Sequence, residues 1–200
     1  MNIVVLVSGN GSNLQALIDA EHTFDLGGSR IAAVIADRSG IYAEKRSEAA
    51  GIPFFTEIPD KALATGDRRR KLSDRILEIS RSYNADLIVQ AGFLSILAGD
   101  IVNEYAGRII NLHPSLLPKF GGKKMYGAHV HQAVLDAGET ESGCTVHIVD
   151  ASIDTGPLLL QRKVPVMAGD SAESLAERIH AEEHKAIVDA VRLMAERLSE

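Results

Sequence analysis

The sequence has a single cysteine, no long apolar run and no surplus of positive charge, and each shortage excludes a class of protein. One cysteine, Cys144, rules out an internal disulfide and a zinc site of four cysteines, which fits a reducing compartment. A net charge of −6 argues against nucleic acid as a partner, because binding a phosphate backbone requires a basic surface. An anionic ligand would have to be held locally, by backbone N–H groups or a few cations.

No apolar stretch approaches the roughly 18 residues that a membrane helix needs. The start, MNIVVLVSGNGS, also lacks the basic segment and the long apolar segment of a signal peptide. We therefore expect a cytoplasmic protein without a membrane partner. Its 200 residues, 46% of them hydrophobic, suffice for one domain that buries about 70% of the surface of the unfolded chain.

Short β-branched segments alternate along the chain with segments of helical periodicity, which is typical of βαβ units. Strands are expected at 3–7, 31–36, 53–56, 86–90, 108–111, 145–150 and 158–166, and helices near 12–22, 41–51, 68–84, 126–137 and 171–198. We predict an α/β fold with a single doubly wound, mostly parallel, Rossmann-like sheet flanked by helices. The last two strands have no helix between them, which predicts a more antiparallel edge near the C-terminus.

The last helix carries one apolar stripe with a carboxylate in its middle. At about 100° per residue, the stripe consists of Leu175, Ile179, Ala186, Ala190 and Met194. Glu183 falls at its centre. Because burying an unpaired carboxylate is costly, we expect Glu183 to border a cleft; the alternative is a side chain whose stem packs while its head reaches water.

The segment VVLVSGNGSNLQALI predicts a strand, a tight glycine turn and a helix. Gly9 and Gly11 permit the bend, and the free N–H groups at the helix start, from Ser12 on, favour an anion such as phosphate. The dinucleotide-binding fingerprint requires a third glycine where this chain has Leu14. Asp37, after the second strand, could still imitate the ribose-binding acid of that fingerprint. A nicotinamide or flavin enzyme and a turn without a ligand therefore stay open.

Four further patterns have competing interpretations. HAEEH at 180–184 could place two histidines on a metal, but no third ligand is evident and boundary histidines are the simpler interpretation. Cys144 and His147 suggest a thiol nucleophile only by proximity, since residues i and i+3 of a strand face opposite sides; a buried cysteine is the alternative.

DRRRK at 67–71 puts cations at a helix start, which indicates either an acidic ligand or a solvated charge run. GGKKMYG at 121–127 is either a surface loop or a lid.

An apolar strand ends in Asn111 and His113, and the prolines that follow, Pro114 and Pro118, prevent a helix from starting there. The carboxyl end of this strand should lie at the ligand edge of the sheet, beside the glycine turn. Asp154, in a tight turn before the last strand, is expected at the same edge. An amide, an imidazole and a carboxylate can supply an oxyanion donor, a general acid and a base or orienting group, so the three together predict catalysis.

The chain also resembles the phosphoribosylglycinamide formyltransferases of de novo purine synthesis. The resemblance covers nearly the whole sequence, in SGNGSNLQALI at 8–18, ADLIVQAGFLSIL at 85–97, NLHPSLLPKF at 111–120, GCTVHIVDASIDTGPLLLQRKVPV at 143–166 and ERIHAEEH at 177–184. It implies transfer of a formyl group from 10-formyltetrahydrofolate, as co-substrate, to the glycine amine of glycinamide ribonucleotide. It implies no metal, and it leaves open whether the protein forms a homodimer.

The resemblance assigns residues as well. The catalytic asparagine, histidine and aspartate of the family match Asn111, His113 and Asp154. The ribonucleotide is expected to bind Gly11, Ser12 and Asn13 through its phosphate and Glu183 through its ribose. Folate contacts are expected at Leu94, Ser95, Ile96 and Leu97, at Asp150, Ala151, Ser152, Ile153 and Asp154, and at an arginine of 68–70, taken as Arg69. Within one domain of 1–200, about 1–105 would mainly bind the phosphate and about 106–200 would hold the catalytic and folate sites.

The implied mechanism is direct attack of the amine on the formyl carbon. Asn111 and a protonated His113 would stabilise the oxyanion, and Asp154 would keep His113 charged. A formyltetrahydrofolate hydrolase shares this chemistry, whereas a methionyl-tRNA formyltransferase should carry a further RNA-binding domain and a basic face. From another class, a non-catalytic nucleotide-binding module would need neither His113 nor Asp154.

Overall fold

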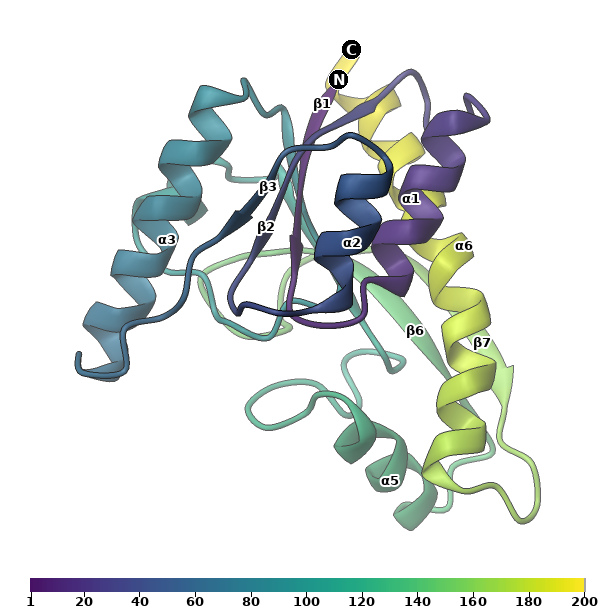
Figure 1. Cartoon of the computed structure of the whole chain (residues 1–200). Helices are drawn as coiled ribbons and strands as arrows, with labels where there is room; N and C mark the ends of the chain where they lie inside the picture. Colours follow the sequence, from purple (N-terminus) through teal and green to yellow (C-terminus); the bar gives the residue numbers. More distant parts are fainter. Residues whose placement is uncertain (200) are drawn as a thin grey trace.

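One seven-stranded sheet forms the centre of the molecule, seen in a computed structural model that describes residues 1–199 (Figure 1). The strands are β1 (Asn2–Val7), β2 (Arg30–Ala36), β3 (Phe54–Thr56), β4 (Leu87–Gln90), β5 (Ile109–His113), β6 (Glu141–Ile148) and β7 (Leu158–Pro165). Their order across the sheet is β3-β2-β1-β4-β5-β6-β7. The first five strands are parallel, whereas β6 pairs antiparallel with β5 and β7. The predicted fold class, with its antiparallel edge, is confirmed.

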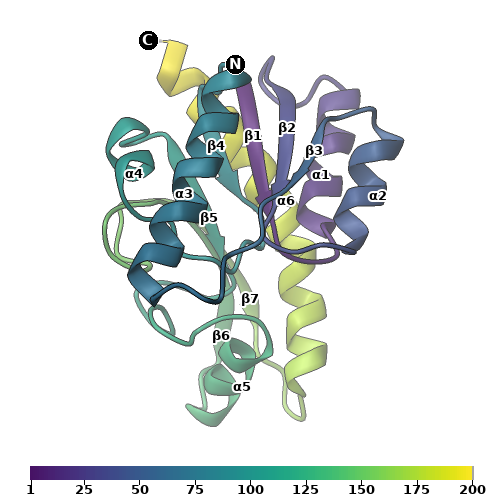
Figure 2. The same cartoon turned by 60° about the vertical axis from the view of Figure 1, so that its left-hand side comes forward.

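Helices cover both faces of the sheet (Figure 2). They are α1 (Ser12–His22), α2 (Tyr42–Ala49), α3 (Thr65–Ser82), α4 (Asp100–Glu104), α5 (Ala128–Asp136) and α6 (Ala172–Ser199). The helices α1, α2 and α6 lie on one face and α3 and α4 on the other, while α5 lies beyond the ends of the strands (Figures 1 and 2). No helix in the described range combines the length and the apolarity needed to span a bilayer.

The alternation of side chains along β1 divides the core in two. Val5 and Val7 pack with residues of α1 and α6, whereas Val4 and Leu6 pack with residues of α3 on the opposite face. All four side chains are fully buried. A continuous apolar strand of this kind is expected where both faces of a parallel sheet are covered by helices.

The strand order reverses between β1 and β4. The chain leaves β1 toward β2 on one side, and it leaves β4 toward β5 on the other. The segments that follow these two strands therefore part at the carboxyl edge of the sheet and leave room for a ligand between them.

Several bounds differ from the prediction by up to three residues, and two differences are larger. The helix α4 has only five residues, too few for helical periodicity to identify it. The strand β6 begins at Glu141 rather than at Thr145, because Gly143, which weakens the strand pattern in the sequence, is accommodated with an extended backbone.

Candidate active site

A cavity of about 580 Å³ lies at the carboxyl edge of the parallel strands, in the size range of small-molecule sites. Its walls come from distant parts of the sequence: 9–13, 90–97, 111–114, 122–127 and 149–154, together with His131, His147, His180 and Glu183. Every residue that the sequence analysis assigned to catalysis or binding lines this cavity, except Arg69.

The turn between β1 and α1 presents N–H groups to the cavity. Gly11 precedes α1 in the left-handed region, with φ 76° and ψ 32°, and no side chain caps the helix. The first helical turn holds no acidic residue. Because the first N–H groups of a helix have no partner within it and carry partial positive charge, this turn is suited to an anion.

The structure adds to the case against a dinucleotide enzyme and removes Asp37 as its support. Leu14 is fully buried in the core, where the fingerprint would need a glycine. Asp37 is also buried, and its Oδ2 accepts a hydrogen bond of 2.7 Å from the hydroxyl of Ser95 while its Oδ1 pairs with Arg38. The carboxylate of Asp37 therefore holds the loop after β4 instead of facing a ribose.

Glu183 borders the cavity, as its place on the apolar stripe of α6 led us to expect. Its Oε2 accepts a hydrogen bond of 3.2 Å from Asn13 Nδ2, and His180 Nε2 lies 3.8 Å from the same oxygen. Burial raises the pKa of Glu183, although the neighbouring His180 and Asn13 lower it. Asn13 is 8% exposed, and its Oδ1 has no hydrogen-bond partner within the described chain. The carboxylate of Glu183, which lines the cavity next to the turn, can thus receive hydrogen bonds from ligand hydroxyls.

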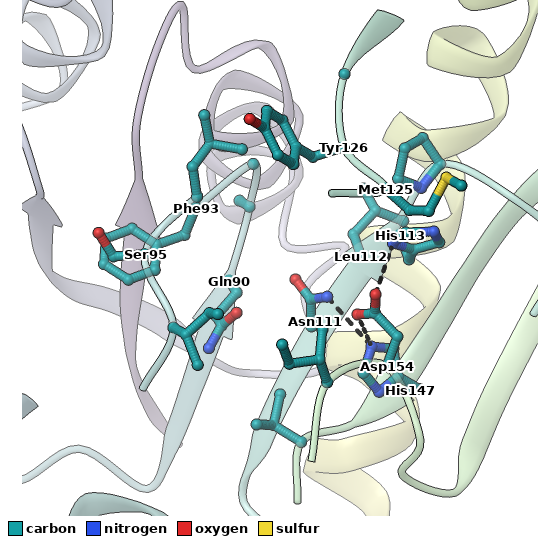
Figure 3. A pocket seen from close by; sticks show the side chains of 18 of the residues that line it. Gln90, Phe93, Ser95, Asn111, Leu112, His113, Met125, Tyr126, His147 and Asp154 are labelled. Carbon is teal, nitrogen blue, oxygen red and sulfur yellow. Dashed lines mark hydrogen bonds and ion pairs between the residues drawn. The ribbon is translucent and has the colours of Figure 1, made fainter. Parts of the chain in front are cut away.

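The register of β5 and β6 gathers the polar side chains that could carry out chemistry (Figure 3). Asn111 and His113, two residues apart on β5, point to the same face. His147 lies directly opposite Asn111 on β6, and Asn111 Nδ2 is 3.2 Å from His147 Nε2. Asp154 reaches in from the loop after β6: its Oδ2 is 3.5 Å from His113 Nδ1 and its Oδ1 is 3.6 Å from His147 Nε2. The three predicted catalytic residues therefore form one cluster.

His147 is the member of this cluster that the sequence analysis did not assign. Its Nδ1 donates to the carbonyl oxygen of Ile148 at 2.9 Å, since a carbonyl can only accept. Its Nε2 is left to face Asn111 and Asp154, so the ring orients the amide of Asn111. The sequence shows a histidine on this strand, but its partner becomes known only from the antiparallel register.

His113 is buried, and its Nε2 donates to the carbonyl oxygen of Phe120 at 2.8 Å. Burial lowers the pKa of His113 below its ordinary value of 6.5, although the charge of Asp154 and the hydrogen bond to Phe120 raise it. His113 is therefore neutral at neutral pH in the protein without ligands. The protonated His113 that the resemblance implies at the oxyanion stage is thus not the resting form, because the cost of burial outweighs the attraction of Asp154. Its protonation during the reaction stays a prediction.

Asp154 remains ionised. Burial alone would raise the pKa of Asp154, but His147, the N–H of Gly122 at 2.9 Å and His113 together lower it below its ordinary value of 3.8. Its backbone is left-handed, with φ 57°, a strained conformation that aspartate tolerates better than most residues. A Cβ on Gly121 would lie 2.5 Å from a methyl group of Leu117 and 3.3 Å from Asp154 Cβ, so only glycine lets this loop pack against the carboxylate.

The loop after β4 is fixed to neighbouring elements. The N–H of Leu94 donates to Ser8 Oγ at 2.8 Å, and the hydroxyl of Ser95 donates to Asp37. A second hollow of about 190 Å³ adjoins the cavity through this loop and is lined by Pro59, Thr65, Arg68, Arg69, Leu72, Leu94, Ser95 and Ile96. The basic residues at the start of α3 therefore face a hollow beside the apolar wall of the cavity.

The HAEEH segment forms no evident metal site. Within residues 1–199, no group of three or more histidine, cysteine, aspartate or glutamate side chains is arranged to hold a metal ion. The side chain of His180 is 53% exposed and lines the cavity, whereas His184 Nε2 is buried without a hydrogen-bond partner in the described chain.

Cys144 is expected to be unreactive. It is fully buried, on the face of β6 opposite His147, and burial raises the pKa of its thiol to about 12. Because the thiolate is the reactive form, a disulfide-exchange reagent at pH 8 should label the folded protein far more slowly than the protein unfolded in guanidinium. Rapid labelling of the folded protein would contradict this burial.

The fold and the site together define a Rossmann-like α/β protein with a cluster of titratable side chains beside a glycine turn that is suited to an anion. The family model described as formyl transferase matches residues 1–191, and the chain belongs to that family.

Named relatives agree with this assignment. The chain is 42% identical to the phosphoribosylglycinamide formyltransferase of Escherichia coli (strain K12), over 92% of this chain and 82% of that protein. It superposes with a TM-score of 0.89 on glycinamide ribonucleotide transformylase 1 from Symbiobacterium toebii, at 37% identity, over 98% of this chain and 88% of that one. It also matches the trifunctional purine biosynthetic protein adenosine-3 of Drosophila pseudoobscura pseudoobscura, at 42% identity over 96% of this chain, but it spans only 14% of the length of that relative.

Proposed function

We propose that this chain transfers a formyl group from 10-formyltetrahydrofolate to the glycine amine of glycinamide ribonucleotide, a step of de novo purine synthesis. Its membership of the formyl transferase family supports the reaction type, and the names of its relatives support the substrates. The observation that carries the proposal at the level of residues is the cluster of Asn111, His113 and Asp154, which shares a cavity with the 9–13 turn.

The spacing of the strands suits a substrate that is anchored at one end and reacts at the other. One strand, β4, separates β1 from β5, so the anion-binding turn and the cluster are about 10 Å apart, twice the usual strand spacing. In the proposal, the N–H groups of Gly11, Ser12 and Asn13 bind the phosphate. Ribose hydroxyls donate to the carboxylate of Glu183, which leaves the glycine amine pointing toward the cluster.

In the proposal, formyl-folate occupies the part of the cavity that the ribonucleotide leaves free. We assign its ring system to the space between the loops 94–97 and 150–154, where backbone groups and apolar side chains meet. Arg69, or its neighbour Arg68, lies in the adjoining hollow and would attract the acidic tail of the folate. Lys123 and Lys124 also line the cavity, from the loop at 122–127.

The chemistry requires positioning more than activation. The substrate amine resembles an α-amino group with a pKa near about 8, so about a tenth of it is the nucleophilic free base at pH 7. The protein therefore has to position this amine rather than activate it. Its nitrogen attacks the formyl carbon, a C–N bond forms, and the carbonyl electron pair moves to oxygen. Asn111 donates a hydrogen bond to this oxyanion, and His113, once it has accepted the amine's proton, stabilises it by its positive charge. As the carbonyl re-forms, the bond to the folate nitrogen breaks, and that nitrogen receives the proton that the amine gives up.

The neutral resting state of His113 indicates where this proton travels. Neutral His113 can accept a proton, and the negative charge developing on the formyl oxygen favours its protonated form. The imidazolium then lies beside ionised Asp154, whose Oδ2 is 3.5 Å from His113 Nδ1. We propose that the proton passes from the amine to His113, directly or through water, and from there to the folate nitrogen.

The proposal draws on both halves of the chain. In the proposal, the turn that binds the phosphate lies within 1–105 and the catalytic cluster within 106–199, as the division of the chain expects. Two assignments depart from this division: Leu94–Leu97 would bind folate and Glu183 would bind the ribonucleotide. Residue 200 lies outside the described residues. A reducing compartment, the cytoplasm, suits a chain whose one cysteine is free and buried.

The identity of the product tests the proposal. Purified protein is incubated with glycinamide ribonucleotide and folate carrying a ¹³C-labelled formyl group, and the carbon is followed by NMR. The expected result is label bonded to the glycine nitrogen, one equivalent for each formyl group lost from folate. Label released only as formate would contradict the proposed transfer.

Replacing Gly11 by valine is expected to weaken ribonucleotide binding, with a Kd raised about 10-fold or more, the scale of one lost charge-assisted hydrogen bond. A Cβ at position 11 would lie 2.8 Å from Ala43 Cβ, and β-branched residues avoid the φ of 76° found here. Calorimetry with the ribonucleotide measures the effect.

Gly40→Val is the matched control for this variant. Gly40 has a similar φ of 70°, no atom lies within 4 Å of its added Cβ, and it is not among the residues that line the cavity. It should therefore lose stability without losing affinity. An unchanged Kd in Gly11→Val would place the phosphate elsewhere.

A further inference from the structure

The side chain of Arg46, on α2, is hydrogen-bonded to the anion-binding turn at 9–13. Arg46 Nε donates to the carbonyl oxygen of Asn10 at 2.9 Å and Nη2 donates to Asn10 Oδ1 at 3.0 Å. Its Nη1 donates to Gln15 Oε1 at 2.9 Å. The guanidinium carbon also lies 4.9 Å from the centre of the Tyr42 ring. Arg46 is thus fixed by contacts to both the turn and the first turns of α1, although it does not line the cavity itself.

These contacts set the direction of the peptide group between Asn10 and Gly11. In a trans peptide the C=O and the N–H point in opposite directions. Because the carbonyl of Asn10 is bound by Arg46, the N–H of Gly11 points away from Arg46. Glycine permits rotation of the adjoining peptide group at little cost, so without Arg46 this group could turn over and present a carbonyl oxygen to an anion.

Arg46 is one of the arginines that pair with no carboxylate within the described residues. Arg75, Arg81, Arg162, Arg178 and Arg192 each pair with a carboxylate. Within the described chain no carboxylate lies within 4.0 Å of Arg46, and all three of its acceptors are neutral oxygens. Its positive charge is therefore not cancelled locally, next to a cavity that also holds the carboxylates of Glu183 and Asp154.

The positive charge of Arg46 affects the pKa of a histidine on α6. Burial lowers the pKa of His184, and the neighbouring His180 and Arg46 lower it further. His184 is one turn along α6 from His180, which lines the cavity. The charge of Arg46 therefore reaches α6 beside the cavity.

We infer that Arg46 is a positioning residue for the substrate phosphate: it locks the Asn10–Gly11 peptide with its N–H available to the anion, and it supplies an uncancelled positive charge behind the turn. This inference rests on the proposed function, in which the phosphate of a ribonucleotide binds there. It makes Arg46 a determinant of affinity for phosphate-bearing ligands, and not a group that touches the reacting atoms.

Arg46→Met tests the inference, because methionine keeps part of the apolar stem and removes the charge and all three donors. The Kd of ribose 5-phosphate and the KM for glycinamide ribonucleotide should each rise about 10-fold or more, while kcat at saturation stays within about twofold. Binding of the dephosphorylated ribonucleoside should not change. An equal loss for the ribonucleoside, or an unchanged Kd for ribose 5-phosphate, would overturn the inference.

Two further variants separate positioning from a general effect on folding. Arg46→Lys keeps the charge but cannot bridge three acceptors, so the Kd of ribose 5-phosphate should lie between those of the wild type and Arg46→Met. Arg30→Met is the matched control, since Arg30 is exposed and its side chain bonds only Asn2; it should bind as the wild type does. If Arg46→Lys binds ribose 5-phosphate as weakly as Arg46→Met, with an unchanged melting temperature, the positive charge does not contribute to affinity. That result would contradict the inference.

The inference and the proposed function can fail separately. Ribose 5-phosphate binding is measured without folate and without turnover. If the wild type binds this probe in an Arg46-dependent way but transfers no formyl group, the proposed reaction fails and the role of Arg46 toward phosphate stands. If formyl transfer occurs with the same KM in Arg46→Met, only the role of Arg46 fails.

Discussion

Replacing His113 by alanine is expected to lower kcat about 100-fold or more, while the ribonucleotide still binds. The loss has this size because the same side chain would relay the proton and, while protonated, stabilise the oxyanion by its charge. Binding should survive because the anion-binding turn follows β1, whereas His113 ends β5. Steady-state kinetics gives kcat, and calorimetry gives the Kd of the ribonucleotide.

A second variant separates chemistry from structure at this position. His113→Gln can keep a donor toward the carbonyl of Phe120, which His113 Nε2 now contacts at 2.8 Å, but it cannot exchange a proton at neutral pH. It should be nearly as slow as His113→Ala. His22→Ala, at the exposed end of α1, is the matched control and should be fully active. Turnover near that of the wild type in His113→Gln would show that His113 only supports the loop.

The pH profile of the wild type supplies a further readout of His113. Neutral His113 is the form that accepts the proton, so kcat/KM, which reports titrations of the free enzyme, should fall as the pH drops through the pKa of His113. Burial places that pKa below 6.5, and the acid limb should lie there. The pKa of Asp154 is below 3.8, so this carboxylate stays charged throughout.

Replacing Asp154 by asparagine is also expected to lower kcat about 100-fold or more. Asparagine tolerates the left-handed backbone found at this position, with φ 57°, and its side-chain oxygen can still accept the N–H of Gly122. The variant therefore removes the charge with little change of shape, and the melting temperature and ribonucleotide Kd should stay close to those of the wild type.

The loss of the Asp154 charge should also move the titration of His113. That charge raises the pKa of His113 against the effect of burial, so its removal should shift the acid limb of kcat/KM to lower pH. Asp136→Asn, an exposed carboxylate on α5, serves as the control and should change neither rate nor profile. An unshifted acid limb in Asp154→Asn would contradict the coupling of these two groups.

The fold could be predicted where local patterns are strong. The apolar segment 3–7 and the glycine turn after it identified β1 and the start of α1, and the missing helix between the last two strands identified the antiparallel edge. The helix α4 could not be predicted, because five residues make little more than one helical turn. Short elements depend on tertiary packing, which a local pattern does not contain.

The candidate site could be predicted in part. Asn111 and His113 share a face because they are two residues apart on one strand, and this periodicity is readable in the sequence. The place of His147 is not readable, since it depends on which residue of β6 lies opposite Asn111. The charge of His113 is not readable either, because it follows from burial under the loop that brings the carbonyl of Phe120 to its ring.

The dependence of folate consumption on the ribonucleotide tests the central claim most directly. A transferase and a hydrolase can share the cluster of Asn111, His113 and Asp154, but only a transferase requires the amine. Loss of 10-formyltetrahydrofolate is followed by absorbance with purified protein, with and without glycinamide ribonucleotide. The account predicts rapid loss only when the ribonucleotide is present. Loss at the same rate in its absence would contradict formyl transfer and indicate hydrolysis.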